Sequence, residues 1–319
     1  MTEKIPLLIL TQLRDHNLDQ IRAVYDVVYA PTDAARAAAV AQHGARIRAV
    51  LTIGVIGLTA DEIDAMPKLE LICAQGVGYE KIALGAARAR GITLANGAGT
   101  NAPVVADHAF GLLLAALRGI VTLDKAVREG KYRDTLPSYM PTLFGKRLGI
   151  IGFGMIGRQL ARRAGGFDME VGYYSRSRHD VAGCRYFDSV PGLAEWCDYL
   201  IAAVPGGAAT HHMVNAQVLE ALGPKGVLVN IARGSVVDTD ALAHALRAGT
   251  IAAAGLDVYE SEPKHPEALI DLANVVLTPH IAGRSPESIQ AQLDRFLANA
   301  DGYFSGRGVV SPVPMDVPA

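Results

Sequence analysis

Residues 147–157 read RLGIIGFGMIG, and this stretch decides how the second half of the chain folds. A short apolar strand pattern, Leu148 to Ile151, leads into three glycines spaced G-x-G-x-x-G, and the helical segment 155–164 follows. In such a unit the first glycine makes a tight turn, the second lets the backbone approach a pyrophosphate, and the third lets helix and strand pack closely. The helix N-terminus offers free N–H groups to the phosphates. The stretch predicts a dinucleotide site whose loop contacts are Gly152, Phe153, Gly154, Met155, Ile156 and Gly157.

The alternation of short apolar runs with Ala-rich helical segments extends in both directions from this unit. Before it, buried strands are expected at 5–10, 25–30, 47–53, 69–74 and 91–96. The second set of expected strands is 147–152, 170–174, 199–204, 226–232, 252–258 and 274–279. Strands that alternate with helices predict parallel sheets with both faces covered. We therefore expect an α/β fold with two doubly wound parallel-sheet domains of the Rossmann or flavodoxin type.

The boundary between the two strand sets is a long apolar helix beginning near Pro103. The last helical segment, 286–304, has no sheet of its own beside it, so we expect it to pack back on the N-terminal domain. This predicts a discontinuous substrate-binding domain, 1–98 plus 285–319, and a dinucleotide-binding domain, 99–284. Small ligands usually bind in clefts between such domains, so the active site is expected there.

Composition narrows the class of protein. The 319 residues are 50% hydrophobic and carry a net charge of −2, which gives no general reason to bind nucleic acid or an anionic membrane. Cys73, Cys184 and Cys197 are widely spaced and odd in number, which predicts a reducing compartment without disulfides or a metal site. The apolar runs 5–10 and 109–117 are too short for a signal peptide or a membrane span. A cytoplasmic protein is expected, with no nucleic-acid or membrane partner.

The segment YYSRSR, 173–178, indicates which dinucleotide binds. About twenty residues after the glycines, an NAD site carries an acid that hydrogen-bonds the ribose 2′-hydroxyl. Here Ser175 takes that place, and Arg176 and Arg178 can bind a 2′-phosphate. The alternative is a solvated basic loop. The segment predicts that NADP(H) is preferred, with NAD(H) possible.

Three polar residues come just past apolar strands of the second set: Arg233, Glu262 and His280. Ligands of open parallel sheets bind beyond the C-terminal strand ends, so the three side chains are expected to converge. Arg can bind the oxygens of a keto acid, His can donate a proton to its carbonyl, and Glu can hold that His charged. Singly, each has another reading: a helix-capping cation, a surface acid or a satisfied buried histidine. Together they favour a catalytic site.

Four blocks in this order, LGIIGFGMIG, VNIARGSVVD, AAAGLDVYESEP and LTPHIAG, resemble the D-2-hydroxyacid dehydrogenase family over nearly the whole chain. The resemblance implies that Arg233 binds the carboxylate and keto oxygen, that Glu262 is the acidic partner, and that His280 is the general acid/base. It implies that Asp257 holds the nicotinamide carboxamide, and that the protein is a homodimer through its cofactor domain. Further implied cofactor contacts are Ser175, Arg176, Ser177, Arg178, Val204, Pro205, Thr210, Ile231, Ala232, Arg233, His280 and Gly283.

The resemblance also implies a substrate subsite in the first domain. The segment QGVGYEKI resembles the family's carboxylate-binding turn, with the N–H groups of Val77 and Gly78 as donors. The short loop from Leu51 to Gly54 would border the substrate.

YYSRSR is similar to the glyoxylate, hydroxypyruvate and hydroxyphenylpyruvate reductase branch, which tends to use NADPH. The formate dehydrogenase branch has Gln where this chain has Glu262, so that branch is disfavoured. The resemblance implies NADPH-dependent reduction of a small 2-keto acid to the D-2-hydroxy acid. The alternatives are the same chemistry on a sugar or aromatic keto acid, or a dinucleotide-sensing, corepressor-like interaction protein.

Two details depart from the pattern or are not explained by it. Asp107 stands where the family usually has Glu, and we expect little consequence. The adjacent His211 and His212 have no third ligand nearby in the sequence, so we interpret them as loop residues and not as a metal site.

Overall fold

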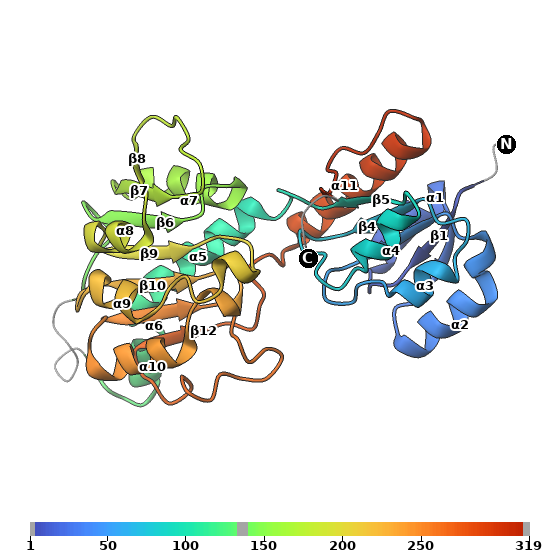
Figure 1. Ribbon diagram of the computed structural model, residues 1–319. Helices are drawn as coiled ribbons and strands as arrows, with labels where there is room; N and C mark the ends of the chain where they lie inside the picture. Colours follow the sequence, from blue (N-terminus) through green and yellow to red (C-terminus); the bar gives the residue numbers. More distant parts are fainter. Residues whose placement is uncertain (1–3, 133–139, 315–319) are drawn as a thin grey trace. The chain divides into compact units, whose positions relative to one another are not determined.

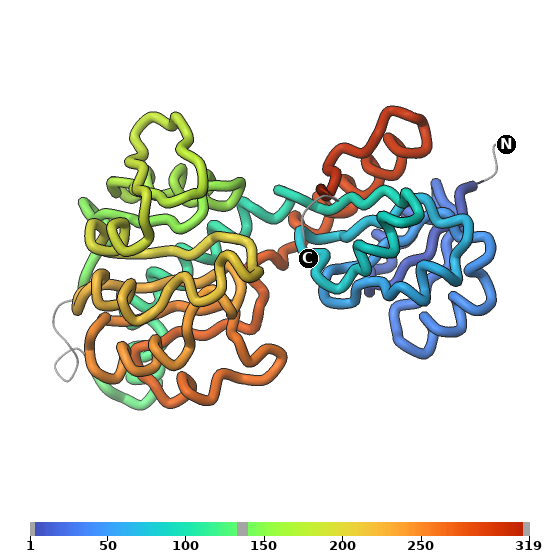
Figure 2. Tube along the Cα trace, in the orientation of Figure 1, coloured from blue at the N-terminus to red at the C-terminus, as the bar shows by residue number. Residues whose placement is uncertain are grey.

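The computed structural model describes residues 4–132 and 140–314, and it divides the chain into two compact units (Figure 1). Unit 1 is formed by Met1–Asn101 and Arg284–Ala319, and unit 2 by Ala102–Gly283. The trace in Figure 2 passes through unit 1 in blue and teal, and its red C-terminal segment belongs to unit 1 again. Each unit contains one parallel sheet, which confirms the expected fold class.

The sheet of unit 1 has five parallel strands in the order β2-β1-β3-β4-β5. Its strands are β1 (Pro6–Ile9), β2 (Asp26–Tyr29), β3 (Ala49–Thr52), β4 (Leu71–Ala74) and β5 (Thr93–Asn96). Its helices are α1 (Asp15–Val24), α2 (Asp33–His43), η1 (Gly44–Arg46), α3 (Ala60–Asp64), α4 (Leu84–Ala89) and α11 (Pro286–Phe304). The core strands are almost wholly apolar because both faces of the sheet are covered.

Helix α11 packs on the sheet of unit 1, although it lies far away in the sequence. Leu293 and Phe296 belong to the same buried cluster as Leu7 and Ile9 of β1. The Phe296 ring lies 6.0 Å from the ring of Tyr25, centroid to centroid. The final helix thus covers a sheet face that would otherwise expose apolar side chains.

The sheet of unit 2 has seven parallel strands in the order β12-β11-β10-β9-β6-β7-β8. Its strands are β6 (Arg147–Ile151), β7 (Glu170–Tyr174), β8 (Cys184–Phe187), β9 (Tyr199–Ala202), β10 (Val227–Asn230), β11 (Ala253–Leu256) and β12 (Val275–Leu277). Its helices are α5 (Ala102–Leu117), α6 (Ile120–Arg128), α7 (Met155–Gly165), α8 (Val190–Trp196), η3 (Ala208–Thr210), α9 (Ala216–Leu222), η4 (Gly234–Val236) and α10 (Thr239–Ala248). The chain runs outward from β6 to β8 and then returns to β9, so the strand order reverses between β6 and β9. Ligands of open α/β sheets bind at such a reversal, beyond the C-terminal strand ends.

Strand β8 corrects the expectation of six strands in the second set. Its sequence, CRYF, has Arg185 in the middle, and its residues are exposed or only half-buried. It pairs with β7 alone and forms the edge of the sheet. An edge strand with one solvated side needs no continuous apolar run, so the apolar pattern of the sequence does not reveal it.

Helix α5 is the core helix of unit 2. It contacts β10 and β11, and Leu112 and Leu113 are buried with Phe110 in the core cluster. Gly255 of β11 allows this approach, because a Cβ there would lie 3.0 Å from Cβ of Leu112. Within the described residues no single helix has the length and apolarity to cross a membrane. Only α5 and α6 taken together pass that test, as a pair bent by 58°.

Candidate active site

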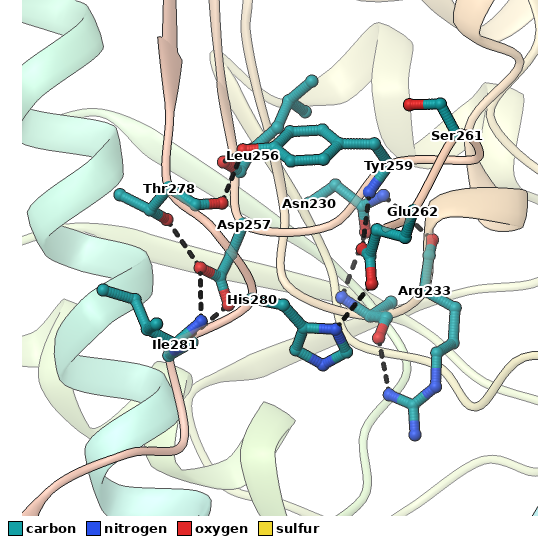
Figure 3. Close-up of polar contacts among 12 residues, drawn as sticks. Asn230, Arg233, Leu256, Asp257, Tyr259, Ser261, Glu262, Thr278, His280 and Ile281 are labelled. Atoms are coloured by element: carbon teal, nitrogen blue, oxygen red, sulfur yellow. Dashed lines mark hydrogen bonds and ion pairs between the residues drawn. The ribbon is translucent and has the colours of Figure 1, made fainter. Parts of the chain in front are cut away.

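Three neighbouring strands of unit 2 present the three expected catalytic side chains beyond their C-terminal ends. Arg233 follows β10, Glu262 lies in the loop after β11, and His280 follows β12. His280 Nδ1 lies 2.8 Å from Glu262 Oε2, and Figure 3 shows Arg233 beside this pair. The other carboxylate oxygen, Oε1, accepts the N–H of Tyr259 at 2.8 Å. A carboxylate can only accept, so Nδ1 carries a hydrogen and Nε2 is the nitrogen free to exchange a proton.

The electrostatics of the pair favour a charged histidine. The hydrogen bond to Glu262 raises the pKa of His280, and this outweighs the opposing effects of burial and of the Arg233 charge. Burial alone would raise the pKa of Glu262. The hydrogen bonds from His280 and from the N–H of Tyr259 hold it below its ordinary value. Both shifts favour the ion pair, and a protonated His280 can act as a proton donor.

Arg233 is held by its neighbours on the chain. The side chain of Asn230 bridges the turn, donating to the Arg233 carbonyl at 3.0 Å and accepting the N–H of Ala232 at 3.0 Å. Arg233 Nη1 donates to the Ala232 carbonyl at 2.8 Å. A Cβ on Gly206 would lie 2.8 Å from Cγ of Arg233, so a glycine is needed where the Arg stem passes. The guanidinium is a fork-shaped donor suited to a carboxylate.

The turn that carries His280 is anchored by Asp257. His280 has a φ of 53°, a left-handed conformation that non-glycine residues rarely adopt. The backbone carbonyl of Asp257 accepts the His280 N–H at 2.8 Å. Its side chain accepts the N–H groups of Ile281 at 3.0 Å and Ala282 at 2.8 Å (Figure 3 shows Ile281). The Asp257 side chain is buried, so three consecutive amides fix the left-handed turn from inside the fold.

The glycine loop has the geometry that a pyrophosphate requires. Gly152 has a φ of 99°, and a Cβ there would lie 2.7 Å from the Ala203 carbonyl oxygen. A Cβ on Gly157 would lie 2.2 Å from the Gly152 carbonyl, so helix α7 and β6 can approach only with glycine there. A Cβ on Gly154 would meet no atom within 4 Å, so open space lies next to the backbone before Met155 begins α7. The loop therefore fits a dinucleotide.

The loop after β7 has no acid at the strand end and two cations beyond it. Tyr173 Oη donates to the His179 carbonyl at 2.6 Å and accepts the His179 N–H at 2.8 Å, which closes the loop. Arg176 and Arg178 are exposed. Among residues 4–132 and 140–314, neither guanidinium has a hydrogen-bond or ion-pair partner. Two unpaired cations at this position suit a phosphate.

The other expected cofactor residues surround the same strand ends. Thr210 Oγ1 donates to the Pro205 carbonyl at 2.8 Å, and this bond shapes the loop that follows β9 and Val204. Ile231 and Ala232 follow β10, and both residues are buried. Gly283 ends unit 2, directly after the turn held by Asp257.

In unit 1 the expected substrate residues lie in neighbouring loops, with one correction. Leu51 belongs to β3 and not to a loop, and its side chain is buried in the core, so it is part of the scaffold. Asn96 Nδ2 donates to the Val77 carbonyl at 2.8 Å and fixes the loop after β4. In the described part of the chain the N–H groups of Val77 and Gly78 have no acceptor, which suits an anionic ligand. A Cβ on Gly54 would lie 2.6 Å from the Gly78 carbonyl, so these two loops pack tightly.

Residues 110–282 match the family model described as the NAD-binding domain of D-isomer-specific 2-hydroxyacid dehydrogenases. The chain belongs to this family. It is 42% identical over 267 residues to the hydroxyphenylpyruvate reductase of Plectranthus scutellarioides, covering 84% of this chain and 85% of that relative. It is 36% identical over 311 residues to a glyoxylate/hydroxypyruvate reductase of Arabidopsis thaliana, covering 98% of this chain and 99% of the relative. The fold resembles that of the NADPH-dependent glyoxylate/hydroxypyruvate reductase of Sinorhizobium meliloti in complex with NADP and malonate. That match has a TM-score of 0.87, 37% identity and 98% coverage of both chains.

The aspartate that departs from the pattern of 2-hydroxyacid dehydrogenases has a partner in this member. Arg163 Nε of α7 donates to Asp107 Oδ1 of α5 at 2.6 Å. The Asp107 side chain is 68% exposed, so this ion pair is a surface contact between the two helices. Surface pairs of this kind contribute little to stability.

The histidine pair of this dehydrogenase has a third ligand-type neighbour, and the expectation that none lay nearby is wrong. Ligand atoms of His211, His212 and Glu260 lie within 4.8 Å of one another. Glu260 follows its strand by only a few residues and is 48 residues from His212, so sequence proximity could not reveal it. His212 Nε2 lies 2.7 Å from Glu260 Oε1, and Glu260 Oε2 accepts the N–H of Thr239. The two imidazole rings are stacked, with centroids 3.9 Å apart. The group is a hydrogen-bonded link between the loops after β9, β10 and β11.

Another histidine near the site was not selected from the sequence. His108 lies on α5, and its Nε2 is 2.9 Å from Thr278 Oγ1. Its position next to Asp107 in a helical segment gave no sign of this contact, which spans 170 residues.

Proposed function

We propose that this family member reduces a small 2-keto acid to the D-2-hydroxy acid and prefers NADPH. The observation that carries the proposal is the Glu262–His280 pair beside Arg233, at the same sheet edge as the dinucleotide loop. Relatives named as glyoxylate, hydroxypyruvate and hydroxyphenylpyruvate reductases support the substrate class. A panel of glyoxylate, hydroxypyruvate, hydroxyphenylpyruvate and 2-ketogluconate, assayed with NADPH, tests it and ranks the substrates.

The reacting groups have separate roles. The nicotinamide cofactor, when bound, would supply the hydride that reduces the carbonyl carbon. His280 donates the proton on Nε2 to the carbonyl oxygen, so that hydride and proton together convert the ketone to an alcohol. Glu262 keeps His280 charged and holds its ring through Nδ1. Arg233 pairs with the substrate carboxylate and keto oxygen, which fixes the orientation of the carbonyl.

The cofactor would be held by groups of unit 2. The N–H groups at the start of α7 would hold the pyrophosphate, and the open space at Gly154 would admit it. Asp257 would accept from the nicotinamide carboxamide through Oδ2, which accepts the Ala282 N–H and keeps a further acceptor position, because Oδ1 already accepts from Thr278 and the Ile281 N–H. The loop from Ser175 to Arg178 would bind the 2′-phosphate. The S. meliloti relative is described as NADPH-dependent and in complex with NADP, which supports NADP(H) as the cofactor.

Substitution of Arg176 should change the choice between cofactors. Arg176→Ala should weaken NADPH binding about tenfold while leaving NADH binding within about twofold, since a charge-assisted hydrogen bond to the phosphate is lost. Arg162→Ala is the matched control, because Arg162 is exposed on the last turn of α7, away from the glycine loop. Fluorescence titration of both cofactors measures the effect. Equal losses for NADPH and NADH would exclude the phosphate-binding role.

The pH dependence should follow the charged state of His280. Its pKa is raised by Glu262, so the proton needed for reduction is present below this raised pKa and lost above it. The kcat/KM for reduction should fall as pH rises through that pKa. Oxidation of the hydroxy acid needs neutral His280 as the base, so it should rise over the same interval.

Glu262→Gln tests whether Glu262 sets the pH at which kcat/KM for reduction declines. Glutamine can keep a hydrogen bond but has no charge, so the descending limb of reduction should move to lower pH. The measurement is a pair of kcat/KM profiles, for wild type and variant, across neutral pH. An unmoved limb would show that Glu262 does not tune His280.

We also propose a homodimer formed through unit 2. Helix α6 exposes Ile120 at 51%, Val121 at 57% and Val127 at 57%, and Phe144 is 70% exposed nearby in the sequence. The segment 132–144, rich in aromatic residues and a second expected part of the dimer surface, lies mostly outside the described residues. Light scattering at micromolar concentration should give twice the mass of 33.7 kDa, and Val121→Asp should reduce it. A wild-type monomer would contradict the proposal.

A further inference from the structure

A chain of hydrogen bonds connects α5 to the turn that carries His280. His108 Nε2 lies 2.9 Å from Thr278 Oγ1, and Thr278 Oγ1 lies 2.6 Å from Asp257 Oδ1. Figure 3 shows that Asp257 bonds both Thr278 and the backbone N–H of Ile281. His108 Nε2 is also 3.5 Å from Asp257 Oδ1. All of these groups belong to unit 2.

The direction of each bond follows from the chemistry of the acceptor. Burial alone would raise the pKa of Asp257, but hydrogen bonds from His108, Thr278 and two backbone amides hold it below its ordinary value. An ionised carboxylate only accepts, so the Thr278 hydroxyl must donate to Asp257. The only hydrogen of that hydroxyl is then used, and His108 Nε2 must donate to Thr278. The His108 imidazole is therefore the first donor in the series of hydrogen bonds that runs through Thr278 to Asp257.

At the other end of this series of hydrogen bonds, Asp257 contacts the turn that carries His280. Asp257 Oδ1 accepts from both Thr278 and the Ile281 N–H, so the position of this oxygen depends on both donors. The backbone of Asp257 holds the His280 N–H, and the φ of His280 is 53°. A strained conformation of this kind persists only where the surroundings over-determine it. Loss of one donor at the buried oxygen would let the carboxylate rotate and loosen the turn.

Helix α5 does not need this bond for its own packing. Leu112, Leu113 and Leu117 anchor it in the core, whereas the His108 side chain remains 24% exposed. A histidine at the edge of the core, directed at a half-buried threonine that bonds a buried aspartate, contributes little apolar burial. Its contact is better explained by orientation of the pair than by stability of the helix.

We propose that His108 is a positioning residue that acts on His280 through Thr278 and Asp257. The proposal rests on the proposed function, in which His280 is the proton donor. His108 itself touches neither the reacting carbonyl nor His280 in this account. It keeps Asp257 Oδ1 oriented, and through it the left-handed turn of His280.

Two substitutions at His108 separate donation from packing. His108→Leu keeps an apolar side chain of useful size but has no donor, so kcat for keto-acid reduction should fall about tenfold while KM for the keto acid changes less than threefold. His108→Gln can donate from a nitrogen near the place of Nε2, and it should recover most of the lost kcat. His244→Leu is the control, because His244 is exposed on α10. A His108→Leu kcat within twofold of wild type, or a Gln variant as slow as the Leu variant, would overturn the proposal.

Thr278 provides the second arm of the test. Thr278→Ser keeps the hydroxyl and should keep the rate, whereas Thr278→Val should lose about as much as His108→Leu. The double variant His108→Leu/Thr278→Val should be no slower than Thr278→Val alone, since both remove the same chain. If the losses in kcat multiplied in the double variant, the two residues would act independently. That result would contradict the proposal that His108 acts through Thr278.

Amide hydrogen exchange gives a readout that does not require turnover. The peptide covering residues 279–283 should exchange faster in His108→Leu than in wild type, and the Gln variant should restore its protection. Unchanged exchange in the Leu variant would overturn the positioning role. If wild type reduced no keto acid, the proposed function would fail, and the exchange measurement would still decide whether His108 holds the turn.

Discussion

His280→Ala should lower kcat for keto-acid reduction by about 10²–10⁴, the usual scale for loss of a positioned general acid. The residue donates through Nε2, and no other group of the Glu262–His280–Arg233 set carries an exchangeable proton suited to this step. Arg233 stays charged at any working pH, and Glu262 is held ionised by His280. The measurement is steady-state reduction at saturating cofactor, at a pH below the descending limb.

The loss should be catalytic and not structural. His280 is half-exposed, and the neighbouring turn keeps its bonds from Ile281 and Ala282 to Asp257. The melting temperature and the NADPH affinity should therefore remain close to those of wild type and of the control His244→Ala. A variant that retains more than a tenth of the wild-type kcat would exclude His280 as the acid.

Arg233→Ala should have an effect of comparable size on kcat/KM, about 10²–10³, because the substrate loses its charged donor near the keto oxygen. Arg233→Lys keeps the charge but not the planar pair of donors, so it should recover only part of the loss. Loss of kcat/KM at unchanged NADPH affinity assigns the defect to the substrate.

The Lys and Ala variants also report on the geometry of the site. The bonds that Asn230 makes to the Arg233 carbonyl and the Ala232 N–H do not involve the Arg233 side chain, so both variants keep them, whereas the Ala variant loses the bond from Arg233 Nη1 to the Ala232 carbonyl. If Lys fully restored kcat/KM, a point charge would suffice, and the two-point orientation of the carboxylate would be excluded.

Much of the fold could be predicted because local sequence and tertiary structure agree. Leu148 to Ile151 form a buried strand, and a Cβ would collide with the backbone at Gly152 and Gly157, the first and third glycines after it. Helix α11 begins where Ser285 accepts the N–H of Ser288 and Pro286 takes the first helical position. Strand β8 has no such agreement, because an edge strand with Arg185 in the middle resembles a loop in composition.

The residues of the candidate site could be predicted from the ends of strands, but several of their partners could not. Glu262 and His280 are 18 residues apart, and both follow neighbouring strands of one sheet, so their convergence follows from parallel topology. The contact between His108 and Thr278 depends on how α5 lies across the sheet, which no local pattern encodes. The link between Glu260 and His212 likewise depends on loop conformations, including a positive φ at His212.

The central claim is stereospecific transfer of a hydride from NADPH to a 2-keto acid. The most direct measurement supplies NADPH deuterated at the transferable position together with glyoxylate or hydroxypyruvate, and analyses the product by mass spectrometry and chiral chromatography. The expected product is a 2-hydroxy acid with one deuterium on C2, in the D configuration for hydroxypyruvate. The rate should fall by about 10²–10⁴ in His280→Ala. Binding of NADPH without transfer of deuterium to any keto acid of the panel would contradict it and would favour a protein that senses the dinucleotide.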